Sequence, residues 1–289
     1  MPTFEREGLS FHYLDKGEGL PFVFQHGLGG DVSQPFGLYT PPAGVRLIGF
    51  DARAHGQTRP VGDVKRVGIA PFADDLIALL DFLGIGRAVV GGISMGAAVA
   101  LNAALRFPDR VLGLVLARPA WLDRPLPENA RVFPHVAQFL LKFGAVEGLT
   151  RYRESPEYRA LLAASPDTAR SLVAQFQEPR AEECVVRLER LPHDCPSHDR
   201  EEWRALRVPT LVLGSRDDPV HPWECAEVLA REIPTAVLGE MTPKSRSFER
   251  HAADLQSAID AFLSRRFGPG GRTSLETGRA TDFESQGKG

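Results

Sequence analysis

Short apolar runs alternate with amphipathic segments through the first 120 residues of the chain. The runs lie at residues 21–25, 45–50, 87–91 and 111–116. Nearly continuous apolar runs of this length are typical of strands buried on both faces of a parallel sheet. At residues 72–83 and 97–106 the apolar positions recur with helical spacing. The alternation predicts an α/β fold with a doubly wound, mostly parallel sheet.

The pattern changes between residues 121 and 204, where no convincing strand is found. Ser155-Pro156 and Ser165-Pro166 each read as an N-cap followed by a proline in the first helical position. We therefore expect an inserted helical subdomain. The α/β pattern then resumes, with strands predicted at residues 210–213 and 235–238 and helices at residues 222–231 and 248–262.

These patterns divide the chain into three parts. Residues 1–120 and 205–267 are predicted to form the α/β core, and residues 121–204 a helical cap. Residues 268–289 are rich in Gly, Ser and Thr and contain few large apolar residues. We expect this last segment to be a disordered tail.

Composition narrows the classes of partner. The 34 Lys and Arg residues nearly balance the 37 Asp and Glu residues, for a net charge of −3. This balance gives no electrostatic signal for binding nucleic acid or an anionic membrane, so a small-molecule substrate or another protein is the expected partner. No apolar run reaches the roughly 18 residues that span a bilayer. The charged N-terminus and the three cysteines favour a cytoplasmic protein, and the cysteines lack metal-ligand spacing, so no metal is expected. The oligomeric state stays open.

The strongest chemical signal is the G-x-S-x-G pattern at residues 92–96 (GISMG), which lies between a predicted strand and a predicted helix. In a nucleophile elbow, small residues let the strand and helix approach while the turn exposes a strained serine. Ser94 is therefore the candidate nucleophile. The alternative is a glycine-rich turn in which Ser94 only caps the helix.

Together with three further motifs, this pattern resembles the α/β-hydrolase superfamily, and the resemblance covers roughly residues 4–265. Residues 26–30 (HGLGG) resemble its His-Gly oxyanion loop, and residues 51–58 (DARAHGQT) its D-x-R-G-x-G-x-S loop. Residues 211–219 (LVLGSRDDP) resemble the strand that carries the triad acid. The resemblance implies an α/β-hydrolase fold whose cap follows the strand that ends near Ala117.

The resemblance also implies donors for an oxyanion. These are the backbone N–H groups of Leu28 and of Met95, the residue after the nucleophile. His26 is more simply explained as a structural residue that ties its loop by hydrogen bonds, since the family's histidine at this place is not the base.

Two neighbouring residues compete for the role of the triad acid. Asp217 has the usual G-x-x-D spacing from Gly214, whereas Asp218 stands four residues before Pro222, which begins a helix. The helix register favours Asp218, with Asp217 as the alternative. Either carboxylate could instead only cap that helix or belong to a surface turn.

The base is the third member of the triad that the resemblance implies. The order Ser, Asp, His along the chain points to His251, the only histidine after the last predicted strand. Residues 240–247 lack the family's usual Gly-His, so His251 would have to reach Ser94 by way of a long loop. His221, close to the acid in sequence, is the alternative. A degenerate site with no triad histidine is the third possibility.

The lead hypothesis is a serine hydrolase, of the carboxylesterase or lactonase type, that cleaves an ester, lactone or thioester of a small, partly apolar substrate through an acyl-enzyme. No cofactor is expected for this hypothesis. Aromatic residues of the cap would roof the pocket. The alternatives are a non-catalytic small-molecule binder or sensor with a degenerate triad, a C–C bond hydrolase or lyase, and a cofactorless oxidoreductase. A dehalogenase or epoxide hydrolase is disfavoured because Ser, not Asp, stands at the elbow.

Overall fold

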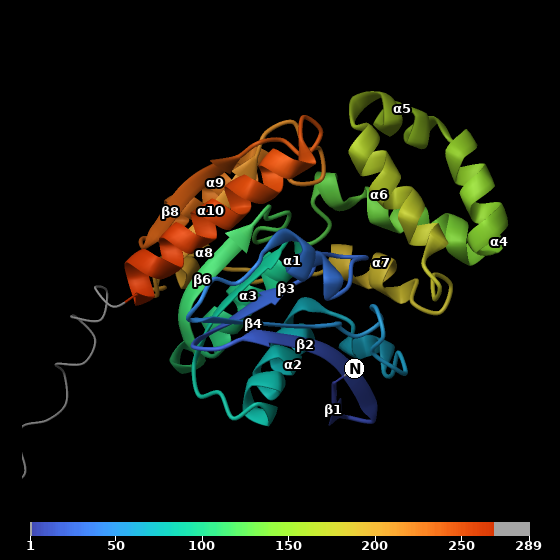
Figure 1. The fold of residues 1–289 in the computed structure, drawn as a ribbon. Helices are drawn as coiled ribbons and strands as arrows, with labels where there is room; N and C mark the ends of the chain where they lie inside the picture. The colour runs from blue at the N-terminus through green and yellow to red at the C-terminus, as the bar shows by residue number, and fades with distance from the viewer. Residues whose placement is uncertain (1, 269–289) are drawn as a thin grey trace, which may run out of the picture.

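A computed structural model describes residues 2–268, and the predicted tail lies outside these residues apart from Gly268. Figure 1 shows a twisted sheet with helices on both faces and a separate group of helices to one side. The sheet has eight strands in the order β1-β2-β4-β3-β5-β6-β7-β8. In this order, every pair of neighbouring strands from β4 through β3 to β8 is parallel, which confirms the doubly wound α/β class.

The strands of the parallel part of the sheet match the predicted strands to within a few residues. They are β3 (Leu20–Gln25), β4 (Val45–Phe50), β5 (Ala88–Ile93), β6 (Val111–Ala117), β7 (Thr210–Ser215) and β8 (Ala236–Met241). Strands β5 and β7 are buried along their whole length. Continuous burial explains why these strands read as unbroken apolar runs.

The N-terminal hairpin was not predicted. Strands β1 (Thr3–Arg6) and β2 (Leu9–Gly17) pair antiparallel, and β2 then pairs antiparallel with β4. Glu5 and the end of β2 are exposed at this edge. Their charged residues interrupt the apolar pattern, because edge strands carry polar side chains that discourage further pairing.

Helices cover both faces of the sheet, and side chains that alternate along the strands divide the core in two. On one face pack α2 (Ile69–Phe82), α3 (Met95–Arg106) and α9 (Trp223–Glu232). The other face is covered by α1 (Ser33–Leu38) and α10 (Phe248–Phe267). Val23 and Phe24, for example, belong to opposite layers.

The chain between β6 and β7 is helical throughout its described elements. It contains η3 (Glu128–Ala130), α4 (Val132–Glu154), α5 (Pro156–Ala164), α6 (Pro166–Gln177), α7 (Val186–Arg190), η4 (Leu191–His193) and α8 (Arg200–Arg204). Both predicted Ser-Pro helix starts are confirmed, and the Ser155 side chain accepts a hydrogen bond from the Tyr158 amide. We call residues 121–204 the helical segment; its helices α4, α5 and α6 stand apart from the sheet in Figure 1.

The remaining short elements are η1 (Val64–Arg66) and η2 (Pro108–Arg110). Within residues 2–268, no helix is both long enough and apolar enough to cross a membrane.

Candidate active site

Ser94 occupies a sharp turn between β5 and α3. Its backbone has φ 58° and ψ −110°, a conformation that costs free energy for a residue with a side chain. A Cβ on Gly92 would overlap the backbone of Gly96, and one on Gly96 would overlap the carbonyl of Gln25. The two glycines therefore allow the close approach of strand and helix that the G-x-S-x-G pattern predicts, and the turn presents the Ser94 hydroxyl at the start of a helix.

His221 lies against this hydroxyl. Its Nε2 is 2.9 Å from Ser94 Oγ, and its Nδ1 is 3.0 Å from both carboxylate oxygens of Asp218. With the proton on Nδ1, the ring donates to Asp218 and accepts the Ser94 hydroxyl proton through Nε2. The structure thus brings a hydroxyl, an imidazole and a carboxylate within hydrogen-bond reach of one another, the three groups that a catalytic triad combines.

The two candidate acids are in different environments. Asp218 is mostly buried, and its Oδ1 also accepts hydrogen bonds from the backbone N–H groups of Val220 and His221. Asp217 is exposed, has φ 58° and lies 3.7 Å from Arg246. The structure therefore brings Asp218, and not Asp217, next to a histidine that contacts Ser94.

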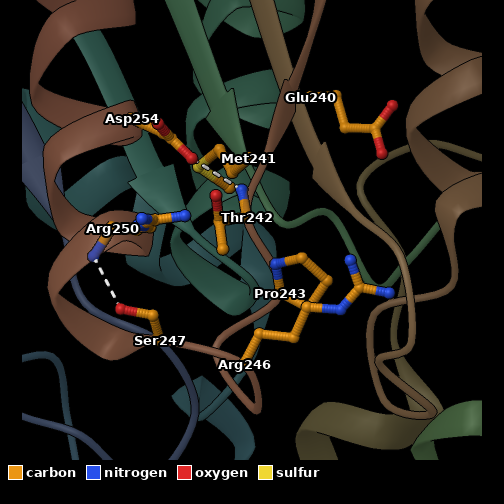
Figure 2. Close-up of a pocket in the computed structure, with 8 residues that line it drawn as sticks. All are labelled: Glu240, Met241, Thr242, Pro243, Arg246, Ser247, Arg250 and Asp254. Carbon is orange, nitrogen blue, oxygen red and sulfur yellow. Dashed lines mark hydrogen bonds between the residues drawn. The ribbon is translucent and has the colours of Figure 1, made fainter.

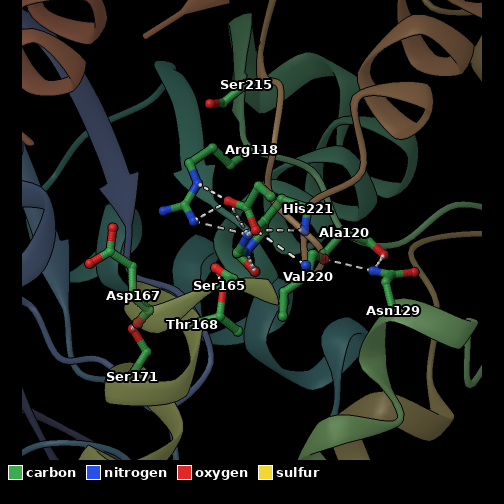
Figure 3. A network of polar contacts seen from close by, with 12 residues as sticks. Arg118, Ala120, Asn129, Ser165, Asp167, Thr168, Ser171, Ser215, Val220 and His221 are labelled. Atoms are coloured by element: carbon green, nitrogen blue, oxygen red, sulfur yellow. Dashed lines mark hydrogen bonds and ion pairs between the residues drawn. The ribbon is translucent and has the colours of Figure 1, made fainter. Parts of the chain in front are cut away.

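Arg118 is a further member of this cluster. It directly follows β6, and its Nη2 lies 2.6 Å from Asp218 Oδ2 and 3.0 Å from His221 Nδ1 (Figure 3). Because a guanidinium can only donate, Arg118 and a protonated Nδ1 are two donors competing for one carboxylate. Arg118 thus holds Asp218 in place while its charge opposes a positive charge on His221.

The electrostatics of the site follow from this arrangement. Burial alone would raise the pKa of Asp218, but His221 and Arg118 outweigh burial and hold that pKa well below its usual range. Burial lowers the pKa of His221, and the charge of Arg118 lowers it further, against the opposing effect of Asp218. His221 is therefore neutral at pH 7, as a general base must be.

His251 is buried near the start of α10 and points elsewhere. Its Nδ1 donates to the Thr242 carbonyl oxygen at 2.8 Å. Within residues 2–268, no hydrogen bond joins it to Ser94 or Asp218. Thr242 also lines a cavity of about 490 Å³ formed by the loop after β8 and the start of α10, shown in Figure 2. The structure thus does not bring the expected base to the nucleophile; His221, the alternative, takes that position.

The expected oxyanion donors flank Ser94. A Cβ on Gly27 would lie 3.4 Å from the Ser94 Cβ, so the loop that carries Leu28 packs directly against the nucleophile. Neither the Leu28 nor the Met95 N–H donates a hydrogen bond to another of the described residues. Both amides are therefore free to bind an oxygen of a substrate.

His26 fixes the position of this loop. Its Nδ1 donates to the Gly27 carbonyl at 2.8 Å, and its Nε2 accepts from the Ala52 N–H at 3.1 Å. The ring therefore ties the loop after β3 to the loop after β4, in agreement with the structural interpretation of His26.

Asn129, in the helical segment, fixes the chain just before His221. Its side-chain NH₂ group donates to the carbonyl oxygens of Ala120 and Val220, at 3.0 and 2.7 Å (Figure 3). Neither Asn129 nor Arg118 was predicted as a site residue. For Arg118 a signal existed, because it directly follows a parallel strand at the sheet edge where ligands bind. No local sequence signal indicates Asn129.

Comparison with known proteins identifies the family of this chain. A family model described as the alpha/beta hydrolase fold matches residues 21–245, which include the elbow and the turn with Asp218 and His221. The chain belongs to the alpha/beta hydrolase family. The suspected family and the expected hydrolase class are thereby confirmed.

One relative by sequence and two solved structures are similar to this chain. This hydrolase is 29% identical over 251 residues to a 2-hydroxymuconate semialdehyde hydrolase of Pseudomonas putida, covering 82% of this chain and 85% of the relative. Among solved structures, the enol-lactonase of Burkholderia xenovorans LB400 is similar with a TM-score of 0.69 and 22% identity, over 91% of this chain and all of that one. A thermophilic esterase of Thermogutta terrifontis is similar with a TM-score of 0.68 and 24% identity, over 90% of this chain and 97% of that one. At these identities the two structures show a shared fold.

Proposed function

We propose that this protein is a serine hydrolase that cleaves an ester, lactone or thioester of a small, partly apolar substrate, with Ser94, His221 and Asp218 as its triad. The observation that carries the proposal is the continuous hydrogen-bonded chain from Ser94 Oγ through the His221 ring to Asp218. A nucleophile, base and orienter in this relation are what acyl transfer requires.

In the first step, Ser94 Oγ attacks the substrate carbonyl carbon while His221 Nε2 takes the hydroxyl proton. The negative charge that forms on the carbonyl oxygen is met by the free N–H groups of Leu28 and Met95. Asp218, held by Arg118, keeps the Nδ1 proton in place and stabilises the imidazolium. The carbon–oxygen or carbon–sulfur bond then breaks, and His221 gives its proton to the leaving group.

In the second step, water releases the acyl group. His221, again neutral, takes a proton from the water as its oxygen attacks the acyl carbon. Collapse of the second tetrahedral intermediate returns the proton to Ser94 and frees the acid. The lowered pKa of His221 suits this role, because it keeps the base unprotonated between the two steps at neutral pH.

The helical segment acts as a lid in this proposal. Ser165 and Thr168, at the start of α6, line the same small cavity of about 30 Å³ as Arg118 and Asp218 (Figure 3). Ser94 is only 5% exposed. A lid so close to the triad would exclude water from the reaction and would have to move to admit a substrate.

Two other functions remain to be tested against this one. The hypothesis of a non-catalytic binder was based on the lack of a histidine shortly after β8. The contact of His221 with Ser94 speaks against it, because a histidine lies beside the serine. Hydrolysis of a C–C bond is favoured by one observation, the 29% identity to a 2-hydroxymuconate semialdehyde hydrolase. Turnover of a vinylogous diketone without turnover of any ester would favour that alternative.

The direct test is covalent labelling with a fluorophosphonate, followed by mass spectrometry of the modified peptide. We expect label on Ser94 in the wild type and none in Ser94→Ala. Hydrolysis of 4-nitrophenyl butyrate is followed in parallel. An unlabelled Ser94, together with unchanged ester turnover in Ser94→Ala, would refute the proposed function.

A further inference from the structure

Arg187 is a buried cation without a counterion. It lies in α7 of the helical segment and is 3% exposed. Its Nη1 donates to the Ala54 carbonyl at 2.9 Å and its Nη2 to the Gln175 side-chain oxygen at 3.3 Å. Its Nε has no partner among the described residues, and no described carboxylate lies within ion-pair distance. The nearby Glu178 carboxylate acts on it only from farther away.

This arrangement is costly for the folded protein. Burial lowers the pKa of Arg187, but a guanidinium remains protonated at neutral pH, so a full charge stays in the interior. Buried charges are normally paired. Arg53, which is 1% exposed, shows the usual solution, because it is bound by the carboxylates of both Asp75 and Glu7.

Negative charge acts on Arg187 only from a distance, because Glu178 raises the pKa of Arg187 without forming an ion pair with it. Burial lowers the pKa of both His26 and His55, and the Arg187 charge lowers them further, for His26 against the opposing effect of Asp51, so both rings are neutral. A guanidinium with a free donor in these surroundings is suited to an anionic oxygen supplied from outside the protein.

Arg187 faces the loop that packs against the nucleophile. The Gln175 side chain contacts Arg187 through its oxygen and donates to the Gly29 carbonyl through its NH₂ group. Gly29 follows Leu28, one of the two candidate oxyanion donors. The 3.3 Å contact with Gln175 is the weaker of the two Arg187 hydrogen bonds and is the one that a carboxylate would replace.

We propose that Arg187 binds a carboxylate of the substrate, at the end remote from the bond that Ser94 attacks. The substrate class is then a monoester, lactone or thioester that carries a free carboxylate on its acyl part. This inference rests on the proposed function and names the substrate class of the same site. A carboxylate can bind a guanidinium through two parallel hydrogen bonds, for which the unused Nε is available.

The kinetic test compares two esters of matched length, 4-nitrophenyl butyrate and the 4-nitrophenyl monoester of succinic acid. We expect wild-type kcat/KM to be higher for the succinate monoester, and Arg187→Gln to lower this preference about 10- to 100-fold, the usual effect of losing a charge-assisted hydrogen bond. The readout is the ratio of the two kcat/KM values, in which a loss of turnover common to both esters cancels, and Arg187→Lys should restore part of the preference.

Arg180→Gln is the matched control. Arg180 also donates to carbonyls of the loop after β4, those of Gly56 and Thr58, but it is paired with Glu183. If Arg187 only anchors the helical segment, both variants should lower turnover of the two esters in parallel. That parallel loss, or a wild type without preference for the succinate monoester, would overturn the proposal.

A binding measurement separates failure of this proposal from failure of the proposed function. Calorimetry with glutarate on Ser94→Ala needs no turnover. We expect binding to Ser94→Ala and its loss in Ser94→Ala/Arg187→Gln. Equal binding by the two proteins, or none by either, would overturn the carboxylate site. If the wild type hydrolyses neither ester, the proposed function fails, and glutarate binding alone then tests whether Arg187 binds a carboxylate.

Discussion

His221 stands three residues after Asp218, and its Nδ1 is equally far, at 3.0 Å, from both oxygens of that carboxylate. The acid and the candidate base thus come from one turn between β7 and α9, instead of from turns after two different strands. The same carboxylate accepts the backbone N–H of His221. The turn therefore fixes backbone and ring together, while Arg118 and Asn129 tie the turn to the rest of the fold.

The first prediction separates the two histidines. His221→Ala should lower kcat for a 4-nitrophenyl ester by about 10²–10⁴-fold, the usual contribution of a general base. His251→Asn should keep most of the activity, because its described hydrogen bond goes to the Thr242 carbonyl. The initial rates of both variants and the wild type at pH 8 test this. The opposite ranking of the two variants would return the role of base to His251.

The elbow that carries Ser94, the proposed nucleophile, could be located from sequence because it is a local pattern. A strand, a strained serine and a helix that meet within five residues need glycines on both sides of the serine, and here these are Gly92 and Gly96. The histidine beside Ser94 could not be located from such a local pattern. Chain order favoured His251, whereas a turn that folds the side chain of His221 back onto Asp218 leaves no periodic signal.

The helical segment shows a similar division. The starts of α5 and α6 were predictable, because Ser-Pro dipeptides act through the first helical turn alone. The contact of Asn129 with Val220 joins residues 91 positions apart. Which helix of an insertion lies over which loop depends on tertiary packing, and no pattern in the sequence encodes it directly.

The second prediction concerns pH. Activity requires neutral His221, so it should be present above the pKa of His221 and be lost as the pH falls through it. Because burial and Arg118 lower that pKa, the acid limb of kcat/KM should lie below pH 6.5, the ordinary histidine value. Arg118→Leu removes a positive charge beside the imidazolium, so the limb should move to higher pH.

Arg216→Leu is the control for this pH profile. Arg216 is an exposed arginine that pairs with Glu240 and has no contact with His221 among the described residues. Its replacement should leave the limb in place. An acid limb that stays unchanged in Arg118→Leu would show that Arg118 does not tune the base.

The third prediction treats Asn129 as a positioning residue. Asn129→Leu leaves the carbonyls of Ala120 and Val220 without their donor, and an unsatisfied buried group costs about 1–3 kcal/mol. With the chain before His221 loosened, kcat should fall by about tenfold, equivalent to about 1.4 kcal/mol, while KM changes little. Steady-state kinetics at the pH optimum measure the separate changes of kcat and KM.

Asn102→Leu provides the comparison for Asn129. Asn102 makes a similar hydrogen bond to the Pro196 carbonyl at 2.8 Å, between α3 and the helical segment, away from His221. It should lose stability in urea unfolding and keep its kcat. An equal fall of kcat in both variants would assign Asn129 a merely structural role.

The fourth prediction tests the close approach at the elbow. In Gly96→Ala the new methyl group would overlap the carbonyls of Gln25 and His26, which belong to β3 and to the loop that carries Leu28. Either the loop or Ser94 must move, so both the fluorophosphonate labelling rate and kcat/KM should fall at least about tenfold, since overpacking typically costs 1–3 kcal/mol. Gly37→Ala, where a Cβ meets no atom within 4 Å, should leave both rates unchanged. A Gly96→Ala protein labelled at the wild-type rate would show that the elbow tolerates a side chain there, and the argument from close approach would be wrong.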